Sequence, residues 1–449
     1  MTSDELVTIA ESVLARAKSG EQIEVVTAHS TDTEVRAYEG EVESFSSADT
    51  YGVGIRVVRD GRQGFASAGT LDREVLAEVL ADARDNLRFA SVDPFVALAE
   101  PDGVAPVELA LFDQRLVDFA TESKIDLVLE LERRVLAADP RIVGVESVEF
   151  ADSVDTTVVL STTGIRAVSR TSGCSAAVYN LAGDGDDVAT GFGFSLGRHP
   201  GELDLDVVVA DATRRATQML GAQRAPSQRL TVVFDPWVSA QFLGIVADAF
   251  SGTEVFRGRS FLADRVGETV ASPKFTLAED PTDQRWMGAS AVDDEGMASR
   301  RVELFDGGVV RGFVHDAYSA RALGATSTGS AVRSGFRSTP SAGARSVVPT
   351  PGHLDDAALI ASVGNGLWVS DVQGLHSGVN PVSGDFSTGI EGRLIRGGEL
   401  AEPVREVTIA STLQRMLAEI VEVGDTLVAL PMNAAGVTLV IGDVTLSGS

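Results

Sequence analysis

The sequence predicts an α+β fold of two domains, rich in antiparallel strands with flanking helices. Short runs of alternating apolar residues are separated by tight-turn signals, and amphipathic helical segments occur singly between these runs. Strands and helices do not alternate regularly, as a doubly wound parallel sheet would require. We therefore expect strands that pair locally through short turns, and a C-terminal domain that is barrel-like or sandwich-like.

The first half opens with a predicted helix and continues as a meander. Apolar residues at helical spacing behind a Ser/Asp start predict an N-capped amphipathic helix from Ser3 to Lys18. Alternating runs from Gln22 to Ala68, with Asp60-Gly61 as a tight-turn signal, predict an antiparallel meander. Helical periodicity then returns at residues 72–89 and 124–138.

Strand patterns occupy residues 142–196, with turn chemistry at Thr163-Gly164 and in the segment 183–187. A helix at about residues 204–220 follows them. The next segment, from Gly221 to Arg229, has neither helical nor strand periodicity, which suits a domain boundary. We therefore place an N-terminal α+β domain at residues 1–221 and a β-rich C-terminal domain at residues 228–449.

The second half begins with a predicted strand at residues 230–234. Asp235-Pro236 then supplies a capping side chain and a first-turn proline for a helix that runs to about Phe250. The Pro/Ser/Gly/Arg stretch at 337–352 predicts a long loop. A hairpin over residues 393–409 and a short helix at 413–420 complete the domain.

The composition is that of a globular protein, with 449 residues, 44% of them hydrophobic and 23% charged. No window approaches the roughly 18 uninterrupted apolar residues of a membrane span, and the acidic start does not resemble a secretory signal. These features predict a soluble cytoplasmic protein that has no membrane partner. A formal charge of −28 makes nucleic acid an unfavourable partner, because phosphate binding depends on Lys and Arg.

Metal-binding motifs are absent from the sequence. None of its five histidines is followed by Glu, so neither HExxH nor HExxxH occurs. A single cysteine, Cys174, leaves too few thiolates for a structural zinc site, and its alternating surroundings predict a buried strand thiol. We expect no metal, cofactor or catalytic residue in this chain, although a site assembled from distant residues stays open.

Two other motif matches have simpler interpretations. Gly193-Phe-Ser-Leu-Gly197 fits GxSxG, but Ser195 lies in an alternating strand and is followed by a loop, not by the helix of a nucleophile elbow. The acidic segment Asp293-Asp-Glu-Gly296 could hold a hard cation, but in so acidic a chain we interpret it as a solvated turn.

The strongest local signal is a glycine-rich run from Gly374 to Gly392, which is otherwise rich in Ser, Thr, Asn and Asp. Such a segment exposes backbone groups and could hold a peptide main chain by β-augmentation. Alternatively, its glycines serve tight hairpins in a barrel. The candidate substrate-binding residues of this run are His376, Asn380, Ser383 and Asp385.

The run Gly378-Val-Asn-Pro-Val-Ser-Gly-Asp-Phe-Ser-Thr-Gly389 closely resembles the C-terminal signature of the TldD/PmbA metallopeptidase family, in its TldE (PmbA) branch. Further segments of the second half match at 260–264, 293–296 and 323–331. The first half agrees only in its layout of helix and meander. The segment Thr408-Ile-Ala-Ser-Thr-Leu413 departs from the branch pattern, which usually has Gly-Asn after the Ala.

The resemblance implies a TldD–TldE heterodimer that degrades or trims unfolded peptides, with zinc held by HExxxH in the TldD-type subunit. The corresponding helix of this chain, after residues 230–234, carries Ser239, Gln241 and Asp248 and no histidine. A TldE-type subunit should show this pattern. Two alternatives stay open: a non-proteolytic peptide-binding scaffold or homodimer, and a hydrolase site around His376, Ser383 and Asp385.

Overall fold

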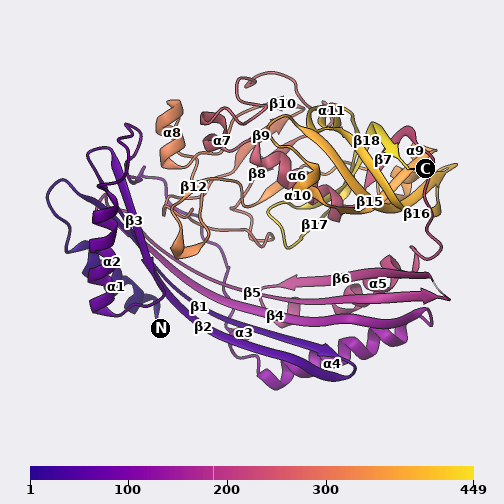
Figure 1. Cartoon of the computed structure of the whole chain (residues 1–449), viewed down its shortest axis with the longest axis horizontal. Helices are drawn as coiled ribbons and strands as arrows, with labels where there is room; N and C mark the ends of the chain where they lie inside the picture. The colour runs from indigo at the N-terminus through magenta and orange to yellow at the C-terminus, as the bar shows by residue number, and fades with distance from the viewer. Residues whose placement is uncertain (186, 449) are drawn as a thin grey trace.

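The N-terminal part of the protein is built on one long antiparallel sheet with the strand order β3-β2-β1-β4-β5-β6. The computed structural model describes residues 1–185 and 187–448. The strands are β1 (Gln22–Tyr38), β2 (Glu41–Arg59), β3 (Arg62–Ala68), β4 (Ile142–Ser161), β5 (Arg166–Asp184) and β6 (Asp187–Gly197). The sheet curves along its length below the C-terminal part (Figure 1).

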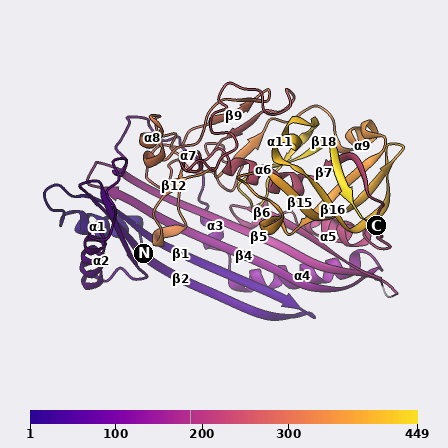
Figure 2. The same cartoon turned by 45° about the horizontal axis from the view of Figure 1, so that its top comes forward.

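Helices cover one face of this sheet. The helices are α1 (Ser3–Leu14), α2 (Arg73–Asn86), α3 (Gln114–Val117), α4 (Thr121–Ala138) and α5 (Leu205–Thr217), with a short 3₁₀ turn, η1, at Pro200–Glu202. Apolar residues of α1 and α2 form a core with β1 and β2, and those of α4 and α5 form another with β4 and β5. The opposite, concave face is therefore left to meet the C-terminal part (Figure 2).

The C-terminal part contains a closed five-stranded barrel. Its order is β16-β15-β14-β7-β18, and pairing between β16 and β18 completes the ring, with β17 added beside β18. The strands are β7 (Gln228–Phe234), β14 (Gly366–Gln373), β15 (Asp385–Arg396), β16 (Glu399–Thr412), β17 (Ile420–Val428) and β18 (Gly436–Ser447). The associated helices are α6 (Pro236–Asp248), α9 (Asp356–Val363), α10 (Leu375–Gly378) and α11 (Leu413–Ala418).

Shorter elements follow α6 in the sequence and precede the barrel strand β14. A four-stranded sheet contains β8 (Leu277–Glu279), β9 (Val302–Asp306), β10 (Val309–Val310) and β13 (Val347–Pro349). A two-stranded sheet contains β11 (Ala331–Val332) and β12 (Ser341–Ala342). The remaining helices are α7 (Gly252–Phe256), α8 (Ala317–Leu323) and the 3₁₀ turn η2 (Gly335–Arg337).

The predicted α+β class and the barrel-like C-terminal part are confirmed, but strand pairing is less local than the sequence indicated. β1 pairs with β4, and β7 lies parallel to β14. Helices and loops separate these partners in the sequence, so local patterns do not reveal the pairings. The predicted loop at 337–352 contains the short strands β12 and β13. The domain limits stay a prediction, and Asp186 of the predicted turn and Ser449 at the predicted end lie outside the described residues.

The predicted turn at Asp293–Gly296 is present, but the prediction that it is solvated is wrong. Asp293 and Glu295 are only 2% and 1% exposed. Glu295 lies 3.1 Å from the guanidinium of Arg56 on β2, and its second carboxylate oxygen accepts the N–H of Ala317. Asp293 accepts three backbone N–H groups. Burial and the negative charge of Glu295 raise the pKa of Asp293 to about 7. A partner from the distant sheet therefore buries this acidic segment.

Glu295 belongs to a buried ion cluster of four side chains, Glu24, Arg56, Glu295 and Arg333. Glu24 pairs with Arg56 at 2.6 Å and with Arg333 at 2.9 Å, and all four side chains are at most 5% exposed. Two strands of the sheet thereby contact two loops of the C-terminal part. The two positive and two negative charges balance within the cluster, which limits the cost of burying them.

Phe336 of η2 also joins the two parts. A Cβ atom on Gly52 would lie 2.1 Å from the Phe336 ring, and one on Gly54 would lie 2.2 Å from the Phe336 carbonyl oxygen. Only glycine at both positions allows β2 to approach this loop so closely. In the described part of the chain, no helix is both long and apolar enough to cross a membrane.

Candidate functional site

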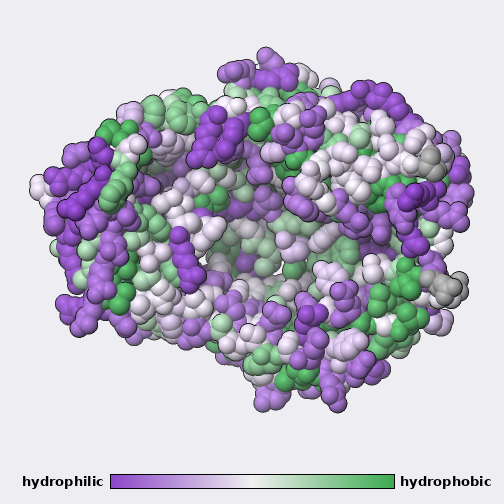
Figure 3. All heavy atoms as spheres, in the orientation of Figure 1, coloured by the Kyte–Doolittle hydropathy of each residue, from purple (hydrophilic) through white to green (hydrophobic). Residues whose placement is uncertain are grey.

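The concave face of the long sheet is hollowed where it meets the C-terminal part (Figure 3). A cavity of about 390 Å³ lies against this wall, and Met287 of the C-terminal part also lines it. Six of its thirteen lining residues are small: Ser46, Ala48, Ala151, Ser153, Gly173 and Ser175. Because such side chains project little, the wall leaves room for an extended chain to lie against it.

Acidic groups mark the same wall. Asp32 and Glu34 are exposed on β1 and line the cavity. Ser30 donates to Asp155 at 2.7 Å and Ser153 donates to it at 3.0 Å, so hydroxyl groups fix the Asp155 carboxylate. The wall therefore presents negative charge, which favours neutral or basic ligands over acidic ones.

A second groove, of about 380 Å³, lies at the C-terminal end of α6. Asp248 ends this helix, and the surrounding protein raises the pKa of Asp248, with the negative charge of Glu254 adding to the effect. Glu254 pairs with Arg259 at 2.6 Å. The opposite rim is formed by Pro381 and Val382 of the glycine-rich run.

Three of the four predicted substrate-binding residues lie together in an exposed turn. The side-chain oxygen of Asn380 accepts the N–H groups of Val382 and Ser383, at 2.9 and 3.1 Å. The Ser383 hydroxyl donates to Asp385 at 2.7 Å. This turn carries Pro381 and Val382 to the groove, so its internal hydrogen bonds position the rim.

His376, the fourth predicted residue, lies exposed on α10. Within the described part of the chain, its side chain makes no hydrogen bond to Ser383 or Asp385. The geometry therefore brings Ser383 and Asp385 together without a histidine base, which a serine nucleophile would need.

The backbone of the glycine-rich run is less available than β-augmentation requires. β15 pairs with β14 on one side and with β16 on the other. Near its start, Val379 bridges to Phe386 and further covers the first side. Only the turn between α10 and β15 presents the run to solvent, so recognition here would use side chains and the turn.

The residues around α6 do not fit a zinc site. The helix carries no histidine, cysteine or glutamate, and its only carboxylate is Asp248. His315 is buried, and its ring nitrogen faces the Ser319 hydroxyl at 3.2 Å. Across residues 1–185 and 187–448, no group of three or more His, Cys, Asp and Glu side chains is arranged to hold a metal ion.

Two other sequence predictions can be compared with the structure. Ser195 lies in β6, where its hydroxyl accepts the N–H of Asp204, as expected for an ordinary strand residue. Cys174 is buried in β5, as predicted, and burial raises its pKa to about 12. A thiol with so high a pKa is a poor nucleophile at neutral pH.

Sequence reasoning did not find Glu254, Arg259 or the polar wall of the sheet as parts of a site. The segment at 260–264, which follows Arg259, stood out in the sequence only as part of the family resemblance. The wall carried no signal, because alternating Ser, Ala and Asp residues are also typical of any solvated strand face.

Comparisons with known proteins agree with this architecture. The chain matches the PmbA/TldA metallopeptidase domain 1 at residues 23–87, the central domain at 115–220 and the C-terminal domain at 227–448. The metalloprotease PmbA of Escherichia coli O157:H7 is 28% identical, with 92% of this chain and 89% of that protein aligned. A PmbA homologue from Haemophilus influenzae is 27% identical, with 91% and 88% aligned.

A crystal structure of TldE from Thermococcus kodakarensis has the same fold, with a TM-score of 0.88, 24% identity and both chains fully covered. The three domain matches place this architecture, a curved sheet that faces a closed barrel, among the proteins of a metallopeptidase family. The chain belongs to the PmbA/TldD metallopeptidase family, which confirms the resemblance found in the sequence.

Proposed function

We propose that this chain is the TldE-like, zinc-free subunit of a two-subunit metallopeptidase that cleaves unfolded peptides. One observation carries the proposal: α6, in the domain that matches the metallopeptidase C-terminal model, has no histidine or glutamate and yet ends at an open groove. The helix thus ends at a groove that a ligand could enter, but it lacks the residues that a zinc peptidase motif needs.

The proposed role of this chain is to hold the substrate. The groove at α6 is lined by residues of the C-terminal part, and the small, polar wall belongs mainly to the long sheet. Their size suits an extended peptide segment and excludes a folded domain. The acidic wall favours neutral or basic segments. When bound in a TldD-type partner, zinc would polarise the scissile carbonyl and activate water.

The test begins with the chain alone and with a HExxxH-bearing chain from the same organism. We expect the two to copurify as a heterodimer and to cleave an unstructured peptide, and we expect a chelator to abolish the cleavage. Turnover by the lone, chelator-treated chain would overturn the proposal. A stable homodimer that binds peptide but never associates with a HExxxH-bearing chain would favour the peptide-binding scaffold instead.

A substitution in the groove tests the assigned role more sharply. Val382 lines the groove and is 49% exposed, whereas Val421 of β17 is 47% exposed and lines neither the groove nor the wall cavity. We expect Val382→Arg to lower turnover of the complex about tenfold, which corresponds to about 1.4 kcal/mol. Val421→Arg should leave turnover unchanged, and equal effects of both variants would contradict the proposed role of the groove.

A further inference from the structure

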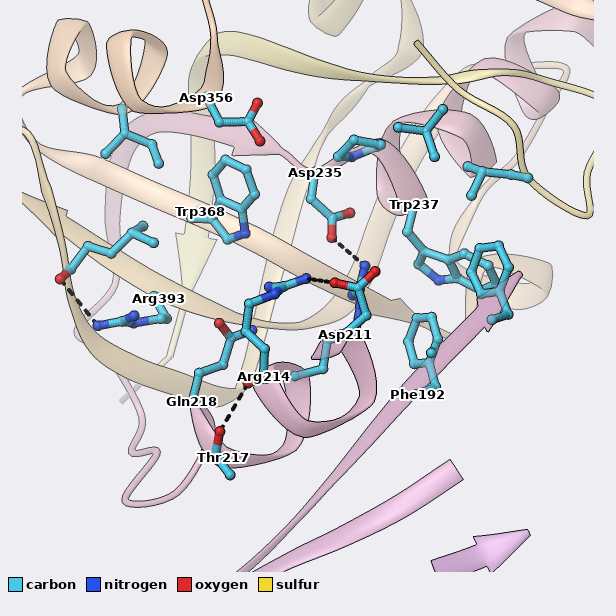
Figure 4. Close-up of a pocket in the computed structure, with 18 of the residues that line it drawn as sticks. Phe192, Asp211, Arg214, Thr217, Gln218, Asp235, Trp237, Asp356, Trp368 and Arg393 are labelled. Atoms are coloured by element: carbon cyan, nitrogen blue, oxygen red, sulfur yellow. Dashed lines mark hydrogen bonds and ion pairs between the residues drawn. The ribbon is translucent and has the colours of Figure 1, made fainter. Parts of the chain in front are cut away.

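A larger cavity lies away from this groove, between α5, β6 and the outside of the barrel (Figure 4). Its volume is about 690 Å³. Sites for small molecules typically measure about 300–1,000 Å³ and combine apolar walls with a few convergent polar groups. The walls here come from both parts of the protein, so their alignment depends on the complete fold.

Aromatic rings form much of the lining. Trp237, at the start of α6, lies 4.7 Å from the ring of Phe192 and 5.4 Å from that of Phe194. Trp368 of β14 lines the opposite side and is 8% exposed. Flat apolar surfaces on two sides favour a ligand that carries a planar ring.

Most charges in the cavity are already paired. Arg215 pairs with Asp235 at 2.9 Å, and its guanidinium carbon lies 4.4 Å from the centre of the Phe192 ring. Arg214 pairs with Asp211 at 3.0 Å. Burial raises the pKa of Asp235 to about 6 in spite of Arg215, so a second anion close to this carboxylate would be disfavoured.

Two charged lining residues have no ion pair in the described part of the chain: Asp356, whose carboxylate accepts the Thr438 hydroxyl, and Arg393 of β15. The Nε of Arg393 donates to the carbonyl of Ala401 and its Nη2 to that of Leu400, at 2.9 and 3.2 Å. Among the residues that the structure describes, no carboxylate pairs with it. Arg393 lies directly opposite Trp368 in the β14–β15 ladder, so both side chains stand on the same face of the barrel. One guanidinium beside an aromatic wall thus lacks a counterion.

A polar side chain at the C-terminal end of α5 also lacks a partner. Gln218, the C-cap residue of this helix, lines the cavity, and its side-chain nitrogen is shielded from solvent and has no hydrogen-bond acceptor in the described part of the chain. Burying a donor without a partner is unfavourable, and a ligand that brings an acceptor would remove this cost.

We propose that this cavity binds a monoanionic carboxylate that carries an aromatic group, of about the size of one or two amino-acid residues. Arg393 binds the carboxylate, the ring lies between Trp237 and Trp368, and Gln218 donates to a carbonyl of the ligand. A free aromatic acid and the C-terminal residue of a peptide share this chemistry. Binding requires no partner subunit and no cleavage, so the proposal stands independently of the peptidase role.

Tryptophan fluorescence of the full chain provides the test, because two of its three tryptophans line the cavity. The ligands are N-acetyl-L-phenylalanine, its amide, and the tetrapeptide Ala-Ala-Ala-Phe with a free or amidated C-terminus. We expect each carboxylate that binds to do so at least tenfold more tightly than the matching amide. Binding of the acetylated residue alone identifies a small-molecule site, and binding of the tetrapeptide identifies a site for peptide C-termini.

Two variants assign the carboxylate contact. Arg393→Gln should weaken binding of the carboxylate at least tenfold and leave binding of the amide unchanged, which also shows that the cavity is intact. Arg396→Gln is the matched control, because Arg396 lies on the same strand, is exposed and pairs with Glu402 outside the cavity. Equal affinity for acid and amide, no binding at millimolar concentration, or equal effects of the two variants would overturn the proposal.

Discussion

Replacement of Arg56 by methionine should destabilise the protein strongly, because Arg56 is the only cation within 4 Å of Glu295 among the described residues. Glu24 would keep its pair with Arg333, but Glu295 would stay buried at 1% exposure with only the N–H of Ala317 as a donor. Breaking a buried pair by removing one partner typically costs about 3–5 kcal/mol. This cost should appear in the free energy of unfolding of Arg56→Met.

Calorimetry is the appropriate measurement. For 449 residues, an unfolding entropy of about 2 cal/mol/K per residue converts a loss of 3–5 kcal/mol into a fall in Tm of about 3–5 °C. Burial already raises the pKa of Glu295. Without Arg56 this pKa rises further, so protonation relieves the unpaired charge at low pH. The fall in Tm should therefore be smaller at pH 5 than at pH 8.

Two further variants decide whether charge is the cause. Arg56→Met combined with Glu295→Gln leaves the neutral Glu24–Arg333 pair and should recover at least about 2 kcal/mol of the loss. Arg59→Met, on the same strand but at an exposed pair with Asp60, should cost less than about 0.5 kcal/mol. A loss below about 1 kcal/mol in Arg56→Met, or no recovery in the double variant, would refute the reasoning.

Three further outcomes are expected. Gly54→Ala should lower the free energy of unfolding, measured by thermal unfolding, by about 1–3 kcal/mol, because the new Cβ would meet the Phe336 carbonyl. Gly69→Ala is the control and should be nearly neutral, because the atom nearest to its Cβ would be 3.7 Å away. Burial raises the pKa of Glu279 from 4.5 to about 7. As the pH rises through that interval, the free energy of unfolding of the wild type should therefore fall by about 3 kcal/mol relative to that of Glu279→Gln. Parallel pH profiles of the two proteins would contradict this. Cys174 should react with a thiol reagent only after unfolding, and rapid modification of the native protein would show that its strand is open.

Local patterns made much of the fold predictable. The helix start at Asp235-Pro236 was correct because a capping side chain and a first-turn proline act within one turn, and Asp235 does accept the N–H of Val238. The hairpin of β15 and β16 was also predictable, because the adjacent residues Gly397 and Gly398 are a local turn signal. Elements that depend on distant partners were missed, as the parallel pairing of β7 with β14 shows.

The residues of the candidate site were likewise predictable only where they lie close together in the sequence. Asn380, Ser383 and Asp385 lie within six residues, so their turn could be expected from the sequence. Glu254 and Arg259 face this turn only because α7 and the following loop fold back beside it. Glu295 illustrates the limit best, since its partner Arg56 lies 239 positions away and no local rule distinguishes it from a solvated acid.

The pairing of β16 with β18 also determines the order in which the chain can fold during synthesis. Every strand of the long sheet precedes residue 198, so this sheet can form while later residues are still being translated. The barrel, in contrast, needs residues 436–447 beside both β7 and β16. Until that strand leaves the ribosome, β7 and β16 expose unpaired edges, and nascent barrels are most exposed to aggregation during this interval.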